Sequence, residues 1–149
     1  MTDRALRIGL GIVTLAGIGV ASYLTYVHYE PAALICSTGG GCETVQQSKY
    51  AVVAGVPIAI FGLVAWVASF LLVLWASELT RMLLVALALI MGAFAIYLVV
   101  LQLFVIDAVC TWCMINDVVL VPLLVTGALW WLYSAGVAED AAAETQTSG

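Results

Sequence analysis

The chain has 149 residues, of which 65% are hydrophobic and only 9% are charged, and its formal net charge is −5. Soluble domains carry about 25% charged residues, so this composition excludes a soluble globular domain with a polar surface. It also excludes a disordered chain, which needs low hydrophobicity, and four basic residues are too few to bind a nucleic-acid backbone. The chain is therefore expected to lie in a lipid bilayer.

Four apolar runs approach or exceed the roughly 20 residues that a helix needs to cross a bilayer. The predicted spanning helices cover about residues 6–29, 56–76, 82–106 and 113–133. No run alternates apolar and polar residues, so helices are favoured over barrel strands, and the fold class is an all-α membrane protein. The first run is longer than the apolar stretch of a signal peptide, about 7 to 15 residues, so we expect it to be retained. Its glycines (Gly9, Gly11, Gly17 and Gly19) are expected to permit close helix packing.

The predicted membrane domain covers residues 1–134, with an outer loop at 30–55 between the first two helices. Residues 135–149 are rich in alanine and acidic side chains, and we expect them to form a short disordered cytoplasmic tail.

The basic residues predict the orientation in the membrane. Arg4 and Arg7 precede the first helix and Arg81 lies between the second and third, on the same side, whereas Lys49 lies on the other side. The positive-inside rule then places both termini in the cytoplasm. The loop at 30–55 and the start of the fourth helix would face outward.

All four cysteines fall in those two outward connections. Cys36 and Cys42 lie in the loop, separated by Ser37, Thr38 and three glycines, whereas Cys110 and Cys113 form a Cys-Thr-Trp-Cys motif where the fourth helix begins. Outside the cytoplasm disulfides form and persist, so two disulfides are the first interpretation. Four cysteines allow three pairings, among which the sequence does not choose.

Two features favour redox exchange over static disulfides. Cysteines two residues apart at a helix N-terminus have lowered thiol pKa values, and we expect the dipole to favour a thiolate on Cys113 in the opening turn. The glycines give the loop the freedom to move Cys36 and Cys42. A zinc site with four cysteine ligands is the remaining alternative, but the five-residue spacing in the loop is not typical of structural zinc sites, and no metal is expected.

Further motifs occur in a fixed order along the chain. The first helix ends in Tyr-Leu-Thr-Tyr-Val-His at residues 23–28, Cys42 begins Cys-Glu-Thr-Val, and Ser48 follows six residues later. Gly-Val-Pro at 55–57 and Phe-Gly at 61–62 precede the Cys-Thr-Trp-Cys motif. Together these motifs resemble bacterial homologues of vitamin K epoxide reductase, over about residues 9–133.

The resemblance implies a four-transmembrane-helix bundle in the bacterial cytoplasmic membrane, with an outer loop and half-helix capping a quinone site. It implies that Cys36 exchanges with a reduced thioredoxin-fold partner, that Cys42 relays to Cys110, and that Cys113 faces the quinone, which is menaquinone or ubiquinone. Many bacterial relatives carry a fused thioredoxin-like domain after a fifth helix. Only the short tail follows here, so a separate partner protein outside the membrane is expected.

Three further residues are weaker candidates for quinone contacts. The resemblance implies that the Ser48 hydroxyl donates a hydrogen bond near the quinone. Asp117 lies four residues after Cys113, one turn further along the same helix face, where relatives often hold another residue. His28, at the outer end of the first helix, could donate to a quinone carbonyl.

The leading hypothesis is a quinone-dependent thiol–disulfide oxidoreductase that reoxidises its partner and so supports disulfide bond formation. One alternative is an oxidoreductase of the disulfide-bond-forming protein B type, in which the closely spaced cysteine pair lies in the first outer loop rather than the second. The other is a non-enzymatic membrane scaffold with two static disulfides.

Overall fold

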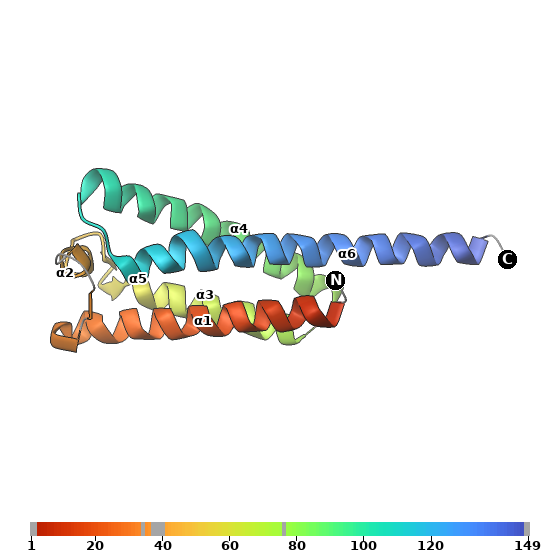
Figure 1. The fold of residues 1–149 in the computed structure, drawn as a ribbon, viewed down its shortest axis with the longest axis horizontal. Coiled ribbons are helices and arrows are strands. Elements are labelled where there is room, and N and C mark those ends of the chain that lie inside the picture. The colour runs from red at the N-terminus through yellow and green to blue at the C-terminus, as the bar shows by residue number, and fades with distance from the viewer. Residues whose placement is uncertain (1–2, 34, 37–40, 76, 148–149) are drawn as a thin grey trace.

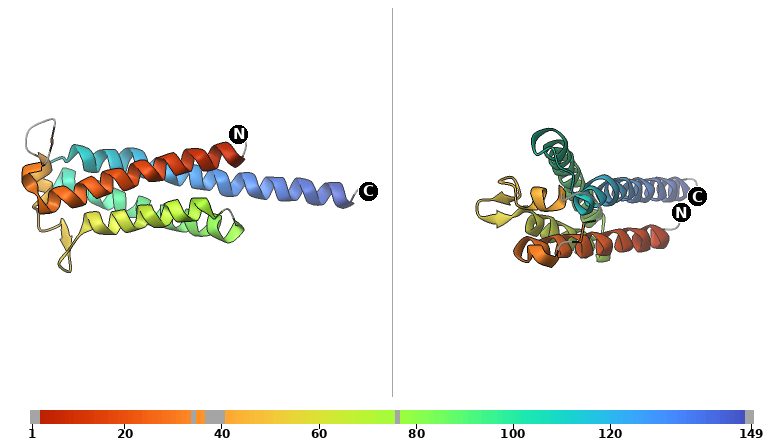
Figure 2. Two further views of the ribbon diagram at one scale, coloured as in Figure 1. Left: turned by 90° about the horizontal axis from the view of Figure 1, so that it is seen from below. Right: turned by 60° about the vertical axis from the view of Figure 1, so that its left-hand side comes forward.

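The computed structural model describes residues 3–33, 35–36, 41–75 and 77–147. Four long helices pack side by side: α1 (Asp3–Tyr29), α3 (Ile58–Leu74), α4 (Glu78–Val100) and α6 (Val121–Thr147) (Figures 1 and 2). In the described part of the chain, the helical runs long and apolar enough to cross a membrane are Asp3–Tyr29, Glu78–Val105 and Thr111–Glu144, and α3 is a shorter apolar helix. The predicted helical membrane fold is confirmed at this level.

Shorter elements connect the long helices. They are the 3₁₀ turn η1 (Pro31–Ala33), helix α2 (Gly41–Gln46), strands β1 (Val52–Val53) and β2 (Val56–Pro57), the π-helical segments η2 (Leu101–Val105) and η3 (Ile115–Leu120), and helix α5 (Thr111–Met114). Figure 1 shows α2 and α5 together at one end of the bundle, and the start of α1 at the other end.

The small hairpin departs from the all-α prediction, which began the second helix at residue 56. β1 and β2 pair antiparallel, with Val53 opposite Val56. The turn uses left-handed backbone at Ala54 (φ 52°) and Gly55 (φ 84°), the latter a conformation natural to glycine. Pro57 follows in an extended conformation, with φ −58° and ψ 134°, and α3 begins only at Ile58. The helix therefore starts two residues later than predicted.

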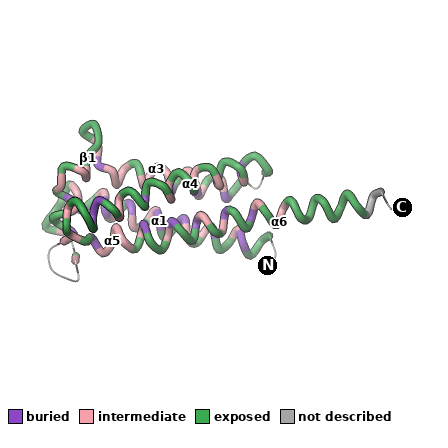
Figure 3. The backbone as a smooth tube through the Cα atoms, turned by 90° about the horizontal axis from the view of Figure 1, so that it is seen from above, coloured by how far each residue is buried: buried purple, intermediate pink, exposed green. Residues whose placement is uncertain are grey.

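The core lies along the inner sides of the long helices (Figure 3). Its largest fully buried side chains include Trp66 of α3, Leu84 of α4, and Leu124 and Trp131 of α6. Many large apolar side chains on the outer sides are exposed, which suits helices that face lipid.

One glycine of α1 sets the contact between α1 and α3. A Cβ atom on Gly17 would lie 2.2 Å from Cδ2 of the buried Trp66 indole, so only glycine fits there. Gly9, Gly11 and Gly19 would place a Cβ in open space, with nothing within 4 Å. The predicted role of glycine in close packing therefore holds for Gly17 and is wrong for the other three.

Arginines join the helices at the end of the bundle away from α2 and α5. Arg7 donates through Nη2 to the carbonyl oxygen of Leu74 at the end of α3, at 3.1 Å. Arg81, at the start of α4, forms an ion pair of 3.3 Å with Asp3. The Trp131 indole donates to the same carboxylate oxygen of Asp3, at 2.6 Å. These contacts tie α1, α3, α4 and α6 together.

The C-terminal segment differs from the expected disordered tail. Helix α6 continues through residues 135–147 and extends past the rest of the bundle (Figure 1). Alanine and glutamate are strong helix formers, which explains why the chain stays helical after its apolar residues end.

Candidate functional site

The cysteines occupy two different redox states. Cys36 and Cys42 form a disulfide with a Cα–Cα distance of 6.3 Å, whereas Cys110 and Cys113 are free thiols. The loop disulfide belongs to one of the three pairings that the sequence left open, in which the other two cysteines pair with each other. A disulfide in the loop leaves only two of the four thiolates that the zinc alternative requires, so the geometry disfavours that alternative.

The two cysteine pairs lie against each other. Cys42 and Cys110 are both fully buried, with 0% exposed surface, in one cluster with Leu24 of α1. Cys36 and Cys113 pack at the edge of the same cluster. Thiol–disulfide exchange needs a thiolate to reach a disulfide sulfur, so the contact between the two pairs in one cluster is the arrangement that such exchange requires.

Gly41 makes that close packing possible. A Cβ atom on Gly41 would lie 2.5 Å from the carbonyl oxygen of Val109, a backbone atom of the residue before Cys110. The sequence predicts that the loop glycines give Cys36 and Cys42 freedom to move. Residues 39 and 40 lie outside the described residues, but Gly41 has another role, because it lets α2 touch the backbone beside Cys110.

The residue before Cys36 is held from two sides. The Ile35 amide donates to the Tyr23 hydroxyl at 2.8 Å, and the Trp112 indole donates to the Ile35 carbonyl oxygen at 2.9 Å. The Tyr23 and Trp112 rings also pack together, with centroids 5.1 Å apart. Trp112 belongs to the Cys-Thr-Trp-Cys motif, so this motif itself holds the loop in place just before Cys36.

The start of α5 favours a thiolate on Cys110. Cys110 is the N-cap residue of α5, and its Sγ accepts a hydrogen bond from the Cys113 backbone N–H at 3.3 Å. The hydrogen bond from the Cys113 side chain lowers the pKa of the Cys110 thiol, although burial of Cys110 acts in the opposite direction. The sequence predicts that the helix N-terminus favours a thiolate on Cys113. In the structure, the hydrogen bond from the N–H at the start of α5 goes instead to the Cys110 sulfur.

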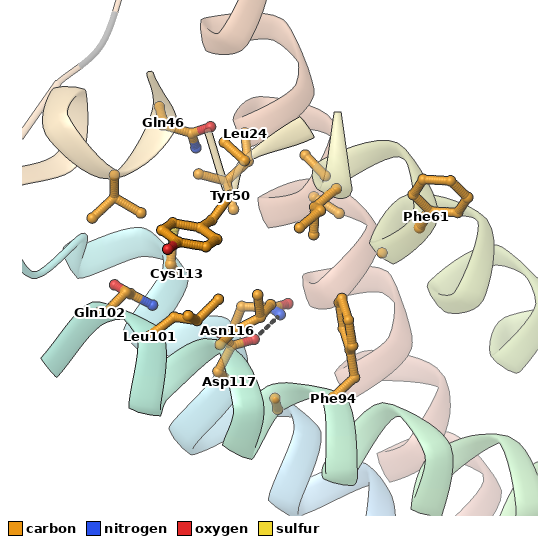
Figure 4. Close-up of a pocket in the computed structure, with 18 of the residues that line it drawn as sticks. Leu24, Gln46, Tyr50, Phe61, Phe94, Leu101, Gln102, Cys113, Asn116 and Asp117 are labelled. Carbon is orange, nitrogen blue, oxygen red and sulfur yellow. Dashed lines mark hydrogen bonds between the residues drawn. The ribbon is translucent and has the colours of Figure 1, made fainter. Parts of the chain in front are cut away.

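Cys113 lines an open cavity of about 190 Å³ whose walls come from α1, α3, α4, η2, η3 and the segment around α2. The walls are mostly apolar, and two ring side chains in them, Phe61 and Phe94, are 51% and 42% exposed. Seven residues contribute polar side chains to the lining: Gln46, Ser48, Tyr50, Gln102, Cys113, Asn116 and Asp117 (Figure 4). An apolar cavity with a few convergent polar groups is typical of a small-molecule site.

A chain of hydrogen bonds orients Asp117 in the cavity wall. The Trp66 indole donates to Asn116 Oδ1 at 2.9 Å, and Asn116 Nδ2 donates to Asp117 Oδ1 at 2.8 Å. Asp117 is only 7% exposed, and its Oδ2 is buried with no hydrogen-bond partner in the part of the chain that the structure describes. One carboxyl oxygen is thus available to a ligand.

The other two predicted quinone contacts have different outcomes. Ser48 lines the cavity, but its hydroxyl donates to the Val45 carbonyl oxygen at 2.8 Å, so its hydrogen is already used. His28 does not line this cavity and lies instead beside a separate depression next to Glu43. The structure therefore brings Ser48, Cys113 and Asp117 together and leaves His28 apart.

Sequence reasoning missed Gln102. Its side-chain Oε1 accepts a hydrogen bond from the buried Cys110 backbone N–H at 2.9 Å, and the residue also lines the cavity. The available signal was an amide inside an otherwise apolar predicted helix, because polar residues at such positions are often functional. The sequence also gave no role to Asn116, which the structure pairs with Asp117.

Comparison with known families agrees with this arrangement. A model described as the vitamin K epoxide reductase family matches residues 8–128. A search of curated proteins finds no significant match. The matched region contains all four cysteines and every residue of the cavity lining, and the resemblance inferred from the sequence motifs is confirmed. The chain therefore belongs to the vitamin K epoxide reductase family, whose members are membrane oxidoreductases of thiols and disulfides.

Proposed function

We propose that this protein is a quinone-dependent enzyme that reoxidises a separate thioredoxin-fold protein outside the cytoplasmic membrane and so supports disulfide bond formation. One observation carries the proposal. The loop disulfide packs against a dithiol motif whose second cysteine, Cys113, lines an apolar cavity. That order supports a thiol relay from the partly exposed Cys36 to a small-molecule site beside Cys113.

The proposed electron path uses the cysteines in sequence. The partner's dithiol attacks at Cys36, which converts the loop disulfide to two thiols and leaves the partner oxidised. The Cys42 thiolate then attacks Cys110 of a disulfide between Cys110 and Cys113, which we call the inner pair. The loop disulfide forms again, and the inner pair becomes two thiols. This inner pair gives two electrons and two protons to a quinone, which leaves as hydroquinone, and its two sulfurs form a disulfide.

The cavity suits a quinone ring better than a polar substrate. Its walls are mostly apolar, and Asp117 offers a buried carboxyl oxygen, without a partner in the described structure, that can accept a hydrogen bond from a hydroxyl of the hydroquinone product. We propose that Asp117 and Ser48 contact the quinone ring beside Cys113. The exposed rings of Phe61 and Phe94 line the same cavity and are available to the apolar tail of a lipid-soluble quinone. His28 lies outside the cavity and has no part in this proposal.

The proposed topology counts α3 as a fourth span, with both termini in the cytoplasm and both cysteine pairs outside. Arg7 and Arg81 lie at the end of the bundle opposite to α2 and α5, as the positive-inside rule requires of this orientation. Thiols held in the cytoplasm stay reduced, so a disulfide-forming role depends on this orientation.

Anaerobic stopped-flow mixing tests the function. Reduced protein mixed with a short-chain ubiquinone or menaquinone should convert it to hydroquinone, followed by ultraviolet absorbance. Cys113→Ala should abolish this reaction, because the remaining thiol Cys110 is fully buried outside the cavity lining. Replacing both Cys36 and Cys42 by alanine should leave quinone reduction by the inner pair intact. A wild-type rate in Cys113→Ala would refute the assignment.

Labelling of intact cells tests the topology. A membrane-impermeant maleimide, added after mild reduction, should label Cys36. In a variant without other cysteines, Glu78→Cys should stay unlabelled until the membrane is opened. Glu78 is a better reporter position than Ser77, because the Ser77 hydroxyl oxygen accepts a hydrogen bond from the Thr80 N–H and so caps α4. Labelling of Glu78→Cys in intact cells would invert the topology.

Mild reduction separates an exchanger from a scaffold. A protein with two static disulfides should keep them under dilute dithiothreitol, whereas an exchanger should lose them and recover them when quinone is added. The family assignment disfavours the disulfide-bond-forming protein B alternative, because the match covers the whole cysteine arrangement.

A further inference from the structure

We propose that Gln102 binds the quinone by donating a hydrogen bond from Nε2 to a carbonyl oxygen, while its Oε1 holds the Cys110 backbone. The inference rests on the function proposed above and adds a residue for which the sequence motifs gave no role. In this proposal the same side chain supports the backbone of the cysteine motif and contacts the quinone in the cavity.

The orientation of the Gln102 amide follows from its first contact. The Cys110 backbone N–H is a donor, so the side-chain atom that faces it at 2.9 Å must be the oxygen. An amide flipped by 180° would set two donors against each other. The Nε2 group must therefore point away from Cys110, and Figure 4 shows the nitrogen on the side of Cys113 and Asn116.

The nitrogen has no acceptor of its own. Gln102 is only 3% exposed and lines the cavity, and no residue in the described ranges accepts a hydrogen bond from Nε2. Nε2 is not among the fully buried polar atoms that lack a partner in the described residues, so it opens onto the cavity and can reach a ligand there. A ligand carbonyl in the cavity would supply the missing acceptor, and a quinone carries two such oxygens.

The backbone around Gln102 fixes the position of the side chain. Its carbonyl oxygen accepts from the Ala108 N–H at 3.1 Å, and Asp107 between them has a left-handed conformation with φ 52°. Both the backbone and the side chain of Gln102 therefore close the chain reversal that leads to Cys110. A donor held this rigidly loses little entropy when a ligand binds.

Quinone affinity of the oxidised protein tests the donor. With Cys110 and Cys113 joined in a disulfide, no turnover occurs. The probe is a short-chain ubiquinone, and its binding is followed by the quenching of tryptophan fluorescence, to which Trp66 in the cavity wall contributes. Gln102→Leu and the similarly shaped Gln102→Met both remove the N–H group. Each should weaken binding by roughly three- to tenfold, the effect of one neutral hydrogen bond.

The control variant is Gln47→Leu. Gln47 is an exposed residue just after α2 whose side-chain amide donates to Glu43 Oε1 at 3.2 Å, and it does not line the cavity. Its loss should leave the affinity unchanged. An equal loss of affinity in Gln47→Leu would show a general effect of removing amides and would overturn the inference.

Infrared spectra separate ligand binding from support of Cys110. A quinone labelled with ¹³C at its carbonyls should show a lowered carbonyl stretching frequency in wild-type protein, and part of this shift should disappear in Gln102→Met. Unchanged affinity and stretch in both Gln102 variants would overturn the inference while the proposed function stands. A wild-type protein that reduces no quinone would overturn the proposed function, and the inference with it.

Discussion

Replacing Gly41 by alanine tests whether the contact between α2 and the Cys110 segment controls the relay. The new Cβ would lie 2.5 Å from the Val109 carbonyl oxygen, whereas carbon–oxygen contacts are ordinarily no closer than about 3.3 Å. The shortfall is roughly 0.8 Å, and it falls on backbone atoms that cannot rotate away. Cys42 follows Gly41 and Cys110 follows Val109, so the two sulfurs should move apart by a similar amount.

The expected effect is large because exchange between sulfurs depends strongly on geometry. A displacement near 1 Å can cost about a hundredfold in rate, so Gly41→Ala should slow the transfer between the two cysteine pairs by roughly ten- to a hundredfold. The affected step is the attack of Cys42 on Cys110. The reaction of Cys113 with quinone should keep its rate, since Gly41 does not line the cavity.

Stopped-flow mixing of fully reduced protein with excess quinone resolves the two steps. The protein holds two dithiols, so it can reduce two equivalents of quinone. The first equivalent comes from the inner pair, and the second requires transfer from the loop pair. Gly41→Ala should slow only the second phase, and Gly19→Ala, whose Cβ meets no atom within 4 Å, should change neither. A second phase at the wild-type rate in Gly41→Ala would refute the reasoning.

Two further predictions follow from the packing and from the thiol pair. Gly17→Ala should lower the free energy of unfolding by about 1–3 kcal/mol, because its Cβ clashes with the Trp66 indole, whereas Gly19→Ala should leave it unchanged or slightly raised. Equal melting temperatures in detergent for the two variants would contradict this packing argument. With the loop cysteines replaced by alanine, Cys113→Ala should raise the pKa of Cys110, because the lowering hydrogen bond is lost, and the thiolate absorbance should appear at higher pH. Cys113→Ser keeps a side-chain donor, so the pKa of Cys110 should stay nearly as low as in the protein with Cys113. Equal titration curves for the alanine and serine variants would contradict the role of this hydrogen bond.

The helices and the cysteine chemistry were accessible from the sequence because each depends on local pattern. A long apolar run must form a helix in a bilayer, and the four predicted runs correspond to α1, α3, the run through η2, and the run from α5 to α6. Cys110 and Cys113 were identified by their spacing alone. Their position at the start of a helix was also correct, although the hydrogen bond to sulfur falls on Cys110.

The remaining features depend on contacts between distant segments, which a single sequence does not specify. Gln102 matters because the chain reverses and brings Cys110 onto its side chain. In the sequence Gly41 does not differ from other loop glycines, because the close contact that requires glycine there is with the distant residue Val109. The hairpin was missed because residues 52–55 were assigned to the outer loop and Val56 and Pro57 to the helix, and strands of two residues each are too short to show an alternating pattern. The tail was misjudged because its acidic composition was weighed above the helix propensity of alanine and glutamate.

The contacts of Arg7 have a consequence for engineering this protein. Its guanidinium satisfies the last carbonyl oxygens of α3, which is the shortest of the long helices. Arg81 likewise neutralises Asp3 and lies over the Trp131 ring. The charges that would direct insertion are thus also used to hold the finished bundle together. Charge-swap mutagenesis at either arginine would damage folding and orientation at once, whereas Arg4, an exposed residue, offers a site where the orientation signal can be altered alone.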